Sequence, residues 1–143
     1  MKKNTPCPCG SGLDYRACCG PRHSGVRPAE TAEQLMRSRF AAYALGNANY
    51  LVATRHPEHR DPDELRGIQA SLRGLRWKKL EIVATAQGGP EDSTGMVEFR
   101  AVYTVNLAPH VMHERSRFRR DNDRWYYCDG EILPAGQGRE SAG

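Results

Sequence analysis

The sequence of 143 residues lacks the long apolar run that a signal peptide or a membrane-spanning helix requires. It starts Met1-Lys2-Lys3-Asn4-Thr5-Pro6 and no apolar stretch follows, so we expect a cytoplasmic chain. It also lacks an internal repeat or heptad pattern. Hydrophobic residues make up 38% of the chain and the mean hydropathy is −0.71, which suits one modest domain with a small appendage.

Two chemical signatures are missing as well. The Cys-x-x-Cys spacing of a redox dithiol is absent, and no set of residues has the spacing of a known catalytic motif. We therefore expect an interaction module rather than an enzyme. The net charge of +4 is compatible with a nucleic-acid or ribosome partner without indicating one.

The most informative feature is a cysteine cluster in the first twenty residues, formed by Cys7, Cys9, Cys18 and Cys19. Two thiol pairs separated by a tight Gly-Ser-Gly turn and a helical turn can converge on one tetrahedral Zn²⁺. In a reducing cytosol, clustered cysteines bind metal more often than they form disulfides. A Cys18–Cys19 bridge would be strained, and bridges between the two pairs would need an oxidising setting. Four thiolates also suit an iron–sulfur cluster, which we rank second because so small a loop would leave it exposed.

The residues around the cysteines predict a metal knuckle. Gly10 and Gly12 permit the positive φ that lets the backbone wrap its amides around thiolate sulfur. Residues 15–19 predict a helical turn, with Gly20 as its stop and Pro21 preventing continuation. Because the segment has almost no apolar residues for a core of its own, metal binding would supply most of its folding energy.

The rest of the chain predicts helices first and strands later. After a linker over residues 21–28, the capping box Thr31-Ala32-Glu33-Gln34 starts a helix to about Leu45. A short helix follows over residues 48–54. Asp61-Pro62-Asp63-Glu64 starts a third helix. Its buried stripe would be Leu65, Ile68, Leu72 and Leu75.

From Trp77 the apolar pattern has a period of two, which predicts strands. The turns would lie at residues 87–94 and 121–123, and the last strand at 125–128. The inward-facing residues would be Leu80, Ile82, Ala84, Val97, Phe99, Ala101, Tyr103, Val105, Leu107, Met112, Ser116 and Phe118. Helices followed by a four-stranded antiparallel meander predict an α+β domain.

The run Cys-Pro-Cys-Gly-Ser-Gly…Tyr…Cys-Cys-Gly resembles the SEC-C motif, a short zinc-binding element found at the C-terminus of the SecA translocation ATPase. The resemblance implies zinc held by Cys7, Cys9, Cys18 and Cys19. In SecA-type proteins the motif is implicated in contact with a chaperone, the ribosome and phospholipid. Such motifs usually carry lysines around the tyrosine, where this chain has Leu13, Asp14 and Arg16, which disfavours a basic, RNA-binding knuckle.

Four further segments resemble the YchJ family of small bacterial proteins of uncharacterised function. They are Leu35-Met36-Arg37-Ser38-Arg39-Phe40, Asn49-Tyr50-Leu51-Val52 with His56-Pro57, Glu114-Arg115-Ser116-Arg117-Phe118 and Trp125-Tyr126-Tyr127-Cys128-Asp129-Gly130. The family joins an N-terminal SEC-C motif to a domain similar to nuclear transport factor 2, a cone of helices packed on a curved antiparallel sheet. The resemblance implies a knuckle over 1–22, a linker over 23–30, the α+β domain over 31–133 and a flexible tail over 134–143. Some relatives carry a second SEC-C motif at the C-terminus, but residues 133–143 here contain no cysteine.

Two groups of residues remain as site candidates. Arg115, Arg117 and Arg119 share one strand face at about 7 Å spacing, which suits either a phosphate-binding stripe or a solvated outer face. Domains of this fold often hold a pocket in which other members use Asp, His or Tyr for acid–base chemistry. The corresponding pocket candidates here are Tyr50, His56, Glu114, Tyr127 and Asp129.

The sequence therefore leads to one main hypothesis and one alternative. The main hypothesis is a zinc knuckle that presents a docking surface for a protein or for ribosome/RNA. The alternative is a small-molecule binding protein or acid–base enzyme that uses the pocket of the α+β domain.

Overall fold

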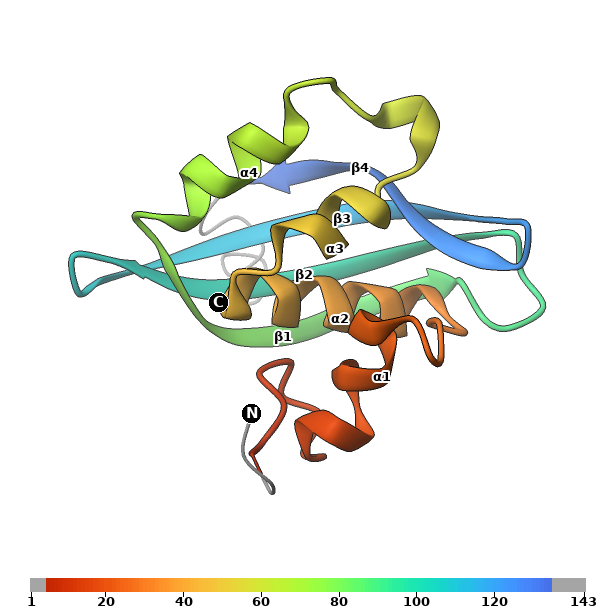
Figure 1. The fold of residues 1–143 in the computed structure, drawn as a ribbon, viewed down its shortest axis with the longest axis horizontal. Coiled ribbons are helices and arrows are strands. Elements are labelled where there is room, and N and C mark those ends of the chain that lie inside the picture. Colours follow the sequence, from red (N-terminus) through yellow and green to blue (C-terminus); the bar gives the residue numbers. More distant parts are fainter. Residues whose placement is uncertain (1–4, 135–143) are drawn as a thin grey trace.

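The computed structural model describes residues 5–134, which form one antiparallel sheet with helices on one face (Figure 1). The strands are β1 (Arg76–Gln87), β2 (Thr94–Val105), β3 (Ala108–Asp121) and β4 (Arg124–Leu133), paired in the order β1-β2-β3-β4. The predicted four-stranded meander is confirmed. Beyond Pro134, the predicted tail lies outside the described residues.

The helical segments precede the sheet in the chain. They are a 3₁₀ turn at Tyr15–Ala17, α1 (Cys19–Ser24), α2 (Ala32–Leu45), α3 (Ala48–Ala53), a second 3₁₀ turn at Pro57–His59, and α4 (Glu64–Leu72). Helices α2, α3 and α4 lie over the same face of the sheet, with the N-terminal knuckle beside α2 and β1 (Figure 1). The expected α+β cone is therefore confirmed. In the described part of the chain, every helix is too short or too polar to cross a membrane.

Helix α2 begins and ends as its sequence indicates. The Thr31 side chain accepts a hydrogen bond from the Gln34 N–H at 3.0 Å, which satisfies a free donor of the first turn. The Gln34 side chain accepts from the N–H of Glu30 at 2.7 Å, one residue earlier than in a standard capping box. Gly46, with φ of 78°, ends the helix in the left-handed conformation that glycine adopts without strain.

The main core lies between α2 and the inner face of the sheet. It joins Leu35, Met36 and Phe40 of α2 to buried residues of all four strands, among them Leu80, Val97, Phe99, Ala101, Phe118 and Trp125. The predicted inward row fails at two places. Ala84 is exposed because a β-bulge between Ile82 and Ala84 reverses the alternation. Leu107 is 93% exposed because it occupies a two-residue hairpin turn with Asn106, both at positive φ.

Two helix predictions need correction. Helix α1 does not stop at Gly20. It continues to Ser24 and ends at Gly25, since Pro21 stands in the first turn, where no backbone N–H is needed. The connection to α2 therefore starts at Gly25, and the predicted boundary at residue 22 falls inside a helix. In α4 the predicted apolar stripe is correct except at one place: Ile68 is buried and Leu72 packs half-buried against the same cluster, but Leu65 is 37% exposed.

We predict that Gly95→Ala destabilises the fold by about 1–3 kcal/mol through overpacking. A Cβ at Gly95 would lie 2.6 Å from the Cα of Gly88 and 3.0 Å from the Cβ of Ala32, where the start of α2 meets the sheet. Urea unfolding would measure the change. Gly67→Ala is the control, because a Cβ at that helical position meets nothing within 4 Å. It should stabilise the fold by roughly 0.5–1 kcal/mol, and equal effects of the two variants would contradict the packing argument.

Candidate functional site

The structure brings the four N-terminal cysteines together. Their sulfur atoms all lie within 4.8 Å of one another. The Cys9 and Cys18 sulfurs are 3.5 Å apart, and those of Cys18 and Cys19 are 3.9 Å apart. Cys7, Cys9 and Cys19 are buried, whereas Cys18 is partly open to solvent.

The backbone of the knuckle folds as its glycines predict. Gly10 and Gly12 have φ of 81° and 91°. The chain reverses direction between Cys7 and Leu13, and the Cys7 N–H donates to the Leu13 carbonyl at 2.9 Å. Gly20 does not end a helix, as the sequence predicted, but its lack of a side chain is required for packing. A Cβ there would lie 2.8 Å from the Tyr15 carbonyl oxygen, so only glycine lets α1 approach the preceding 3₁₀ turn.

Hydrogen bonds among the thiols of the cluster shift the pKa values of Cys9 and Cys19 in opposite directions. The pKa of the Cys9 thiol falls well below its ordinary value because the Cys19 and Cys7 thiols hydrogen-bond its sulfur. The pKa of Cys19 is raised because its proton is shared with the sulfurs of Cys7 and Cys9. One thiolate thus forms readily, and further thiolates need a cation beside them.

These residues fit a tetrahedral metal ion. With metal–sulfur bonds of about 2.3 Å, the sulfurs of a tetrahedral site stand about 3.8 Å apart. The separations of 3.5 Å and 3.9 Å bracket that value. Backbone N–H groups of Cys9 and Cys19 hydrogen-bond the Cys7 sulfur, and the Ser11 hydroxyl lies 3.1 Å from the Cys18 sulfur. Such contacts offset negative charge on thiolate ligands, so the cluster could hold a metal ion.

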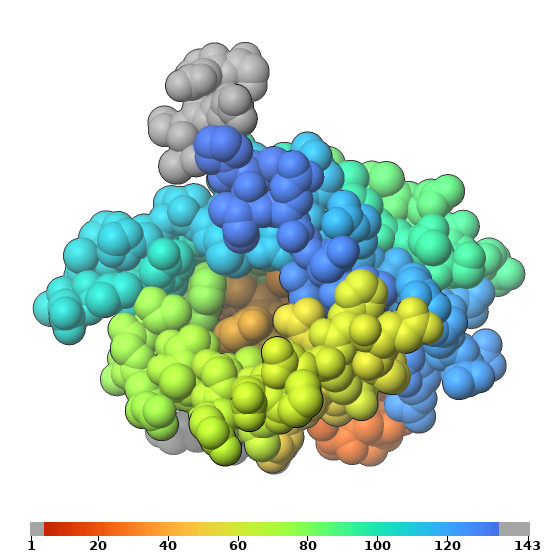
Figure 2. Space-filling view, turned by 90° about the horizontal axis from the view of Figure 1, so that it is seen from above, coloured from red at the N-terminus to blue at the C-terminus, as the bar shows by residue number. Residues whose placement is uncertain are grey.

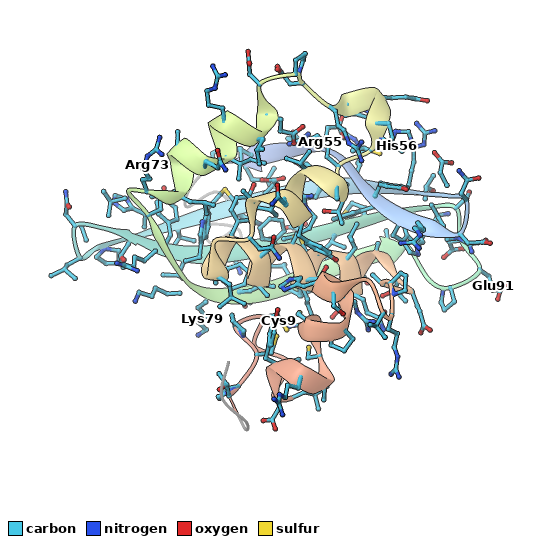
Figure 3. The ribbon with its side chains drawn as sticks, in the orientation of Figure 1. Cys9, Arg55, His56, Arg73, Lys79 and Glu91 are labelled. Atoms are coloured by element: carbon cyan, nitrogen blue, oxygen red, sulfur yellow. The ribbon has the colours of Figure 1, made fainter. Side chains whose placement is uncertain are left out.

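The knuckle is packed firmly against α2. Ala41, fully buried on α2, joins the cysteines in one apolar cluster, and Figure 3 shows Cys9 beside this helix. Arg37 donates to the Cys9 carbonyl at 2.9 Å and pairs with Glu33 at 3.0 Å.

His23 of α1 makes a second connection between the knuckle and α2. Its Nδ1 lies 2.6 Å from the Tyr15 hydroxyl and its Nε2 lies 2.8 Å from the Ser38 carbonyl oxygen. Because a carbonyl only accepts, Nε2 carries the proton and Nδ1 accepts from Tyr15. Burial lowers the pKa of His23, which favours this neutral form.

The predicted arginine row lies on the sheet face that points away from the helices, and every member is paired with carboxylates. Arg115 lies 3.6 Å from Glu98 and 3.7 Å from Glu131, and Arg117 lies 2.8 Å from Asp129. Arg119 pairs with Glu58 at 3.1 Å and Asp121 at 3.2 Å. Phosphates would have to compete with these acids, and the phosphate-binding role stays a prediction.

The predicted pocket residues do not form one site. His56 is buried, and its Nδ1 accepts from the Glu58 N–H at 3.1 Å, so Nε2 donates to Asp121 at 2.5 Å. Both ring nitrogens are thereby used in holding the second 3₁₀ turn to β3, and this hydrogen bond lowers the pKa of Asp121. Tyr50 bonds Ser38 at 2.7 Å, beside α1.

Glu114 and Tyr127 do meet, in a cavity of about 240 Å³ between α2, α4 and the inner sheet face, here named the cone pocket. The Tyr127 hydroxyl donates to Glu114 at 3.1 Å. Burial, and then the charge of Glu114, raise the pKa of Tyr127, so it remains a proton donor at neutral pH.

The residues that line the cone pocket and that the sequence reasoning missed include Arg39, Arg55 and Trp77. Arg39 lies on the buried face of α2. A charged residue within the apolar stripe of a helix is the sequence signal that could have identified it as a pocket residue.

We predict that Cys19→Ser lowers the bound transition-metal content from about one ion per chain to near zero, because the tetrahedral set loses a buried thiolate. Mass spectrometry of the purified, folded protein would measure the metal. Cys128→Ala is the matched control, since Cys128 is buried alone in β4, away from the knuckle. Equal metal content in Cys19→Ser and wild type would refute this ligand set.

Comparison with known proteins agrees with this division of the chain. The family model of the YchJ middle domain, similar to nuclear transport factor 2, matches residues 31–130, and the SEC-C motif model matches residues 4–21. A UPF0225 protein of Corynebacterium glutamicum is 49% identical over 126 residues, covering 88% of this chain and 96% of that protein. A UPF0225 protein of Geobacter sulfurreducens is 44% identical, covering 87% of this chain and 77% of that protein.

Solved structures show the same fold. A SEC-C motif containing protein from Rhodopseudomonas palustris superposes with a TM-score of 0.81 at 39% identity, covering 90% of this chain and 98% of that one. A calcium/calmodulin-dependent kinase type II association domain from Thiobacillus denitrificans superposes with a TM-score of 0.59 at 15% identity. The match covers 76% of this chain and 99% of that domain, and it shows a shared fold alone. On the strength of the matches over both parts, this chain belongs to the YchJ (UPF0225) family, in which a SEC-C motif precedes a domain like nuclear transport factor 2.

Proposed function

We propose that Cys7, Cys9, Cys18 and Cys19 hold Zn²⁺ and that the metal-bound knuckle is a docking element for another protein. The observation that carries this proposal is the sulfur cluster itself, whose separations suit a tetrahedral ion. Four thiolates favour zinc over the harder divalent cations. A closed set of four ligands leaves no position for a substrate, so the metal supplies structure rather than catalysis.

The contacts that attach the knuckle to α2 support a docking role. Arg37 and His23 tie it to α2 through the Cys9 and Ser38 carbonyls, and Ala41 packs against its cysteines. A partner that binds the knuckle would therefore meet a surface already ordered, which lowers the entropy cost of association.

The exposed tip of the knuckle favours a protein partner over nucleic acid. Residues 10–13 are exposed, and Leu13 is an apolar side chain that is 53% exposed. Arg16 is the only arginine or lysine between Thr5 and Gly20, too few for a phosphate-binding stripe. An exposed leucine on a rigid turn is a suitable anchor for an apolar recess on another protein, including a ribosomal protein.

We expect Leu13→Asp to abolish retention of the partner in a pull-down and ribosome co-sedimentation from lysate, since a carboxylate would be desolvated in an apolar recess. Leu107→Asp is the matched control, because Leu107 is an exposed leucine on the β2–β3 turn. The double variant Cys18→Ser/Cys19→Ser should lose the same partner while circular dichroism confirms that its main domain is folded.

Salt concentration separates the two kinds of partner. Retention of a protein through Leu13 should change little between low and high salt, whereas phosphate contacts weaken steeply. Partners that bind the cysteine double variant and Leu13→Asp as well as wild type would rule out the knuckle as the docking element. Loss of a partner only at high salt, with Leu13→Asp unaffected, would point to RNA instead.

A further inference from the structure

The cone pocket opens to solvent on the side of α4. Figure 2 shows the hollow between α4 and the strands β3 and β4, with atoms of α2 at its floor. Its volume of about 240 Å³ equals that of about eight liquid waters, which suits a molecule of roughly ten non-hydrogen atoms. Its apolar walls include Phe40, Phe99 and Met112.

Arg39 is a buried cation in this pocket whose charge is not met by a carboxylate. Its side chain is 3% exposed, and Nη1 donates to the Leu51 carbonyl at 2.8 Å and to the Thr54 hydroxyl at 2.7 Å. Within residues 5–134, Arg39 forms no ion pair, and its Nε and Nη2 make no hydrogen bond. Because a buried charge is costly without a counter-ion, this guanidinium has spare capacity for an anion.

Arg55 adds a second positive charge beside the first. Both guanidinium groups lie over the Tyr127 ring, with Cζ of Arg39 4.6 Å and Cζ of Arg55 4.9 Å from its centroid. Arg55 is paired with Glu64 of α4, which holds it at the mouth of the pocket. Arg39 is therefore the cation that remains free to bind.

Trp77 lines the same pocket and carries a donor without a partner. Its indole Nε1 is buried, and among the described residues it is the one buried side-chain nitrogen or oxygen that lacks a hydrogen-bond partner. Trp125 shows the ordinary arrangement, since its Nε1 donates to the Glu30 carbonyl at 3.1 Å. A buried indole N–H normally finds an acceptor, and none of residues 5–134 supplies one here.

Glu114 supplies an acceptor to complement these donors. Its Oε2 accepts from Ser116 at 2.7 Å and from Tyr127 at 3.1 Å, and its Oε1 bonds to none of residues 5–134. A Cβ at Gly130 would lie 2.0 Å from that Oε2, so the glycine on β4 leaves room for the carboxylate. The pocket thus holds a buried guanidinium and a carboxylate near the Tyr127 ring, and an indole on β1.

We propose that the cone pocket, a site separate from the knuckle, binds a small organic carboxylate. The ligand's carboxylate would pair with Arg39, its apolar body would pack on Phe99 and Trp77, and a hydroxyl group would donate to Glu114. A carboxylate matches the planar donor set of a guanidinium and meets the missing negative charge.

The test uses 4-hydroxybenzoate as the probe and the full-length, metal-loaded protein in a buffer free of carboxylates. ¹⁵N-labelled protein is titrated while the two indole N–H signals are followed, with Trp77→Phe used to assign them. The Trp77 signal should shift saturably and the Trp125 signal should stay, because Trp77 lines the pocket and Trp125 does not. No shift of the Trp77 signal at millimolar probe would overturn the proposal.

A matched probe isolates the role of the carboxylate in the wild-type protein. 4-Hydroxybenzyl alcohol keeps the ring and the hydroxyl but lacks the negative charge, and should bind at least about tenfold more weakly. Equal affinity for the two probes would overturn the carboxylate assignment. This comparison decides the matter even where a variant of Arg39 fails to fold.

A pair of variants assigns the cation. Arg39→Gln, shown to be folded by its amide spectrum, should bind 4-hydroxybenzoate at least about tenfold more weakly than wild type. Arg100→Gln is the control, since Arg100 lies on the other face of the sheet and pairs with Glu81. Equal binding by folded Arg39→Gln and Arg100→Gln would refute the role of Arg39.

Discussion

The burial of helix α2 on three of its sides is the constraint on which the rest of the structure depends. Three consecutive residues belong to three different apolar clusters: Phe40 to the core with the sheet, Ala41 to the cysteine cluster, and Ala42 to the cluster with α3 and α4. The small side chains at 41 and 42 let the knuckle and α3 approach closely. A shift of α2 would therefore disturb the cone pocket and the knuckle together.

Charge is distributed differently on the two faces of the sheet. On the outer face, arginines stand opposite acids across the strands, as Arg117 does opposite Asp129, and solvent screens what remains. In the cone pocket, Arg39 and Glu114 are buried without forming an ion pair. Because unpaired buried charges cost stability, their presence in an open pocket supports a role in binding rather than in folding.

The cysteine knuckle and the domain are one packed unit rather than two independent parts. The knuckle contributes few apolar side chains, and its order depends on its ligands and on α2. Tyr15, His23 and Ser38 form a continuous hydrogen-bonded path from the knuckle into α2, and Ser38 continues it to Tyr50. A change in the knuckle should therefore reach the packing around α2 and α3.

The sequence by itself determined the cysteine cluster, the order of the elements and the helix-then-sheet architecture, because short spacings, caps and period-two patterns act locally. It could not locate the bulge beside Ala84 or the turn at Leu107, since strand register is a property of pairing. It named Glu114 and Tyr127 for the pocket but grouped them with His56, which the fold uses as a cap. Only the tertiary structure brought Arg39 and Trp77 to Glu114, because α2, β1 and β3 meet through long-range packing that no local pattern encodes.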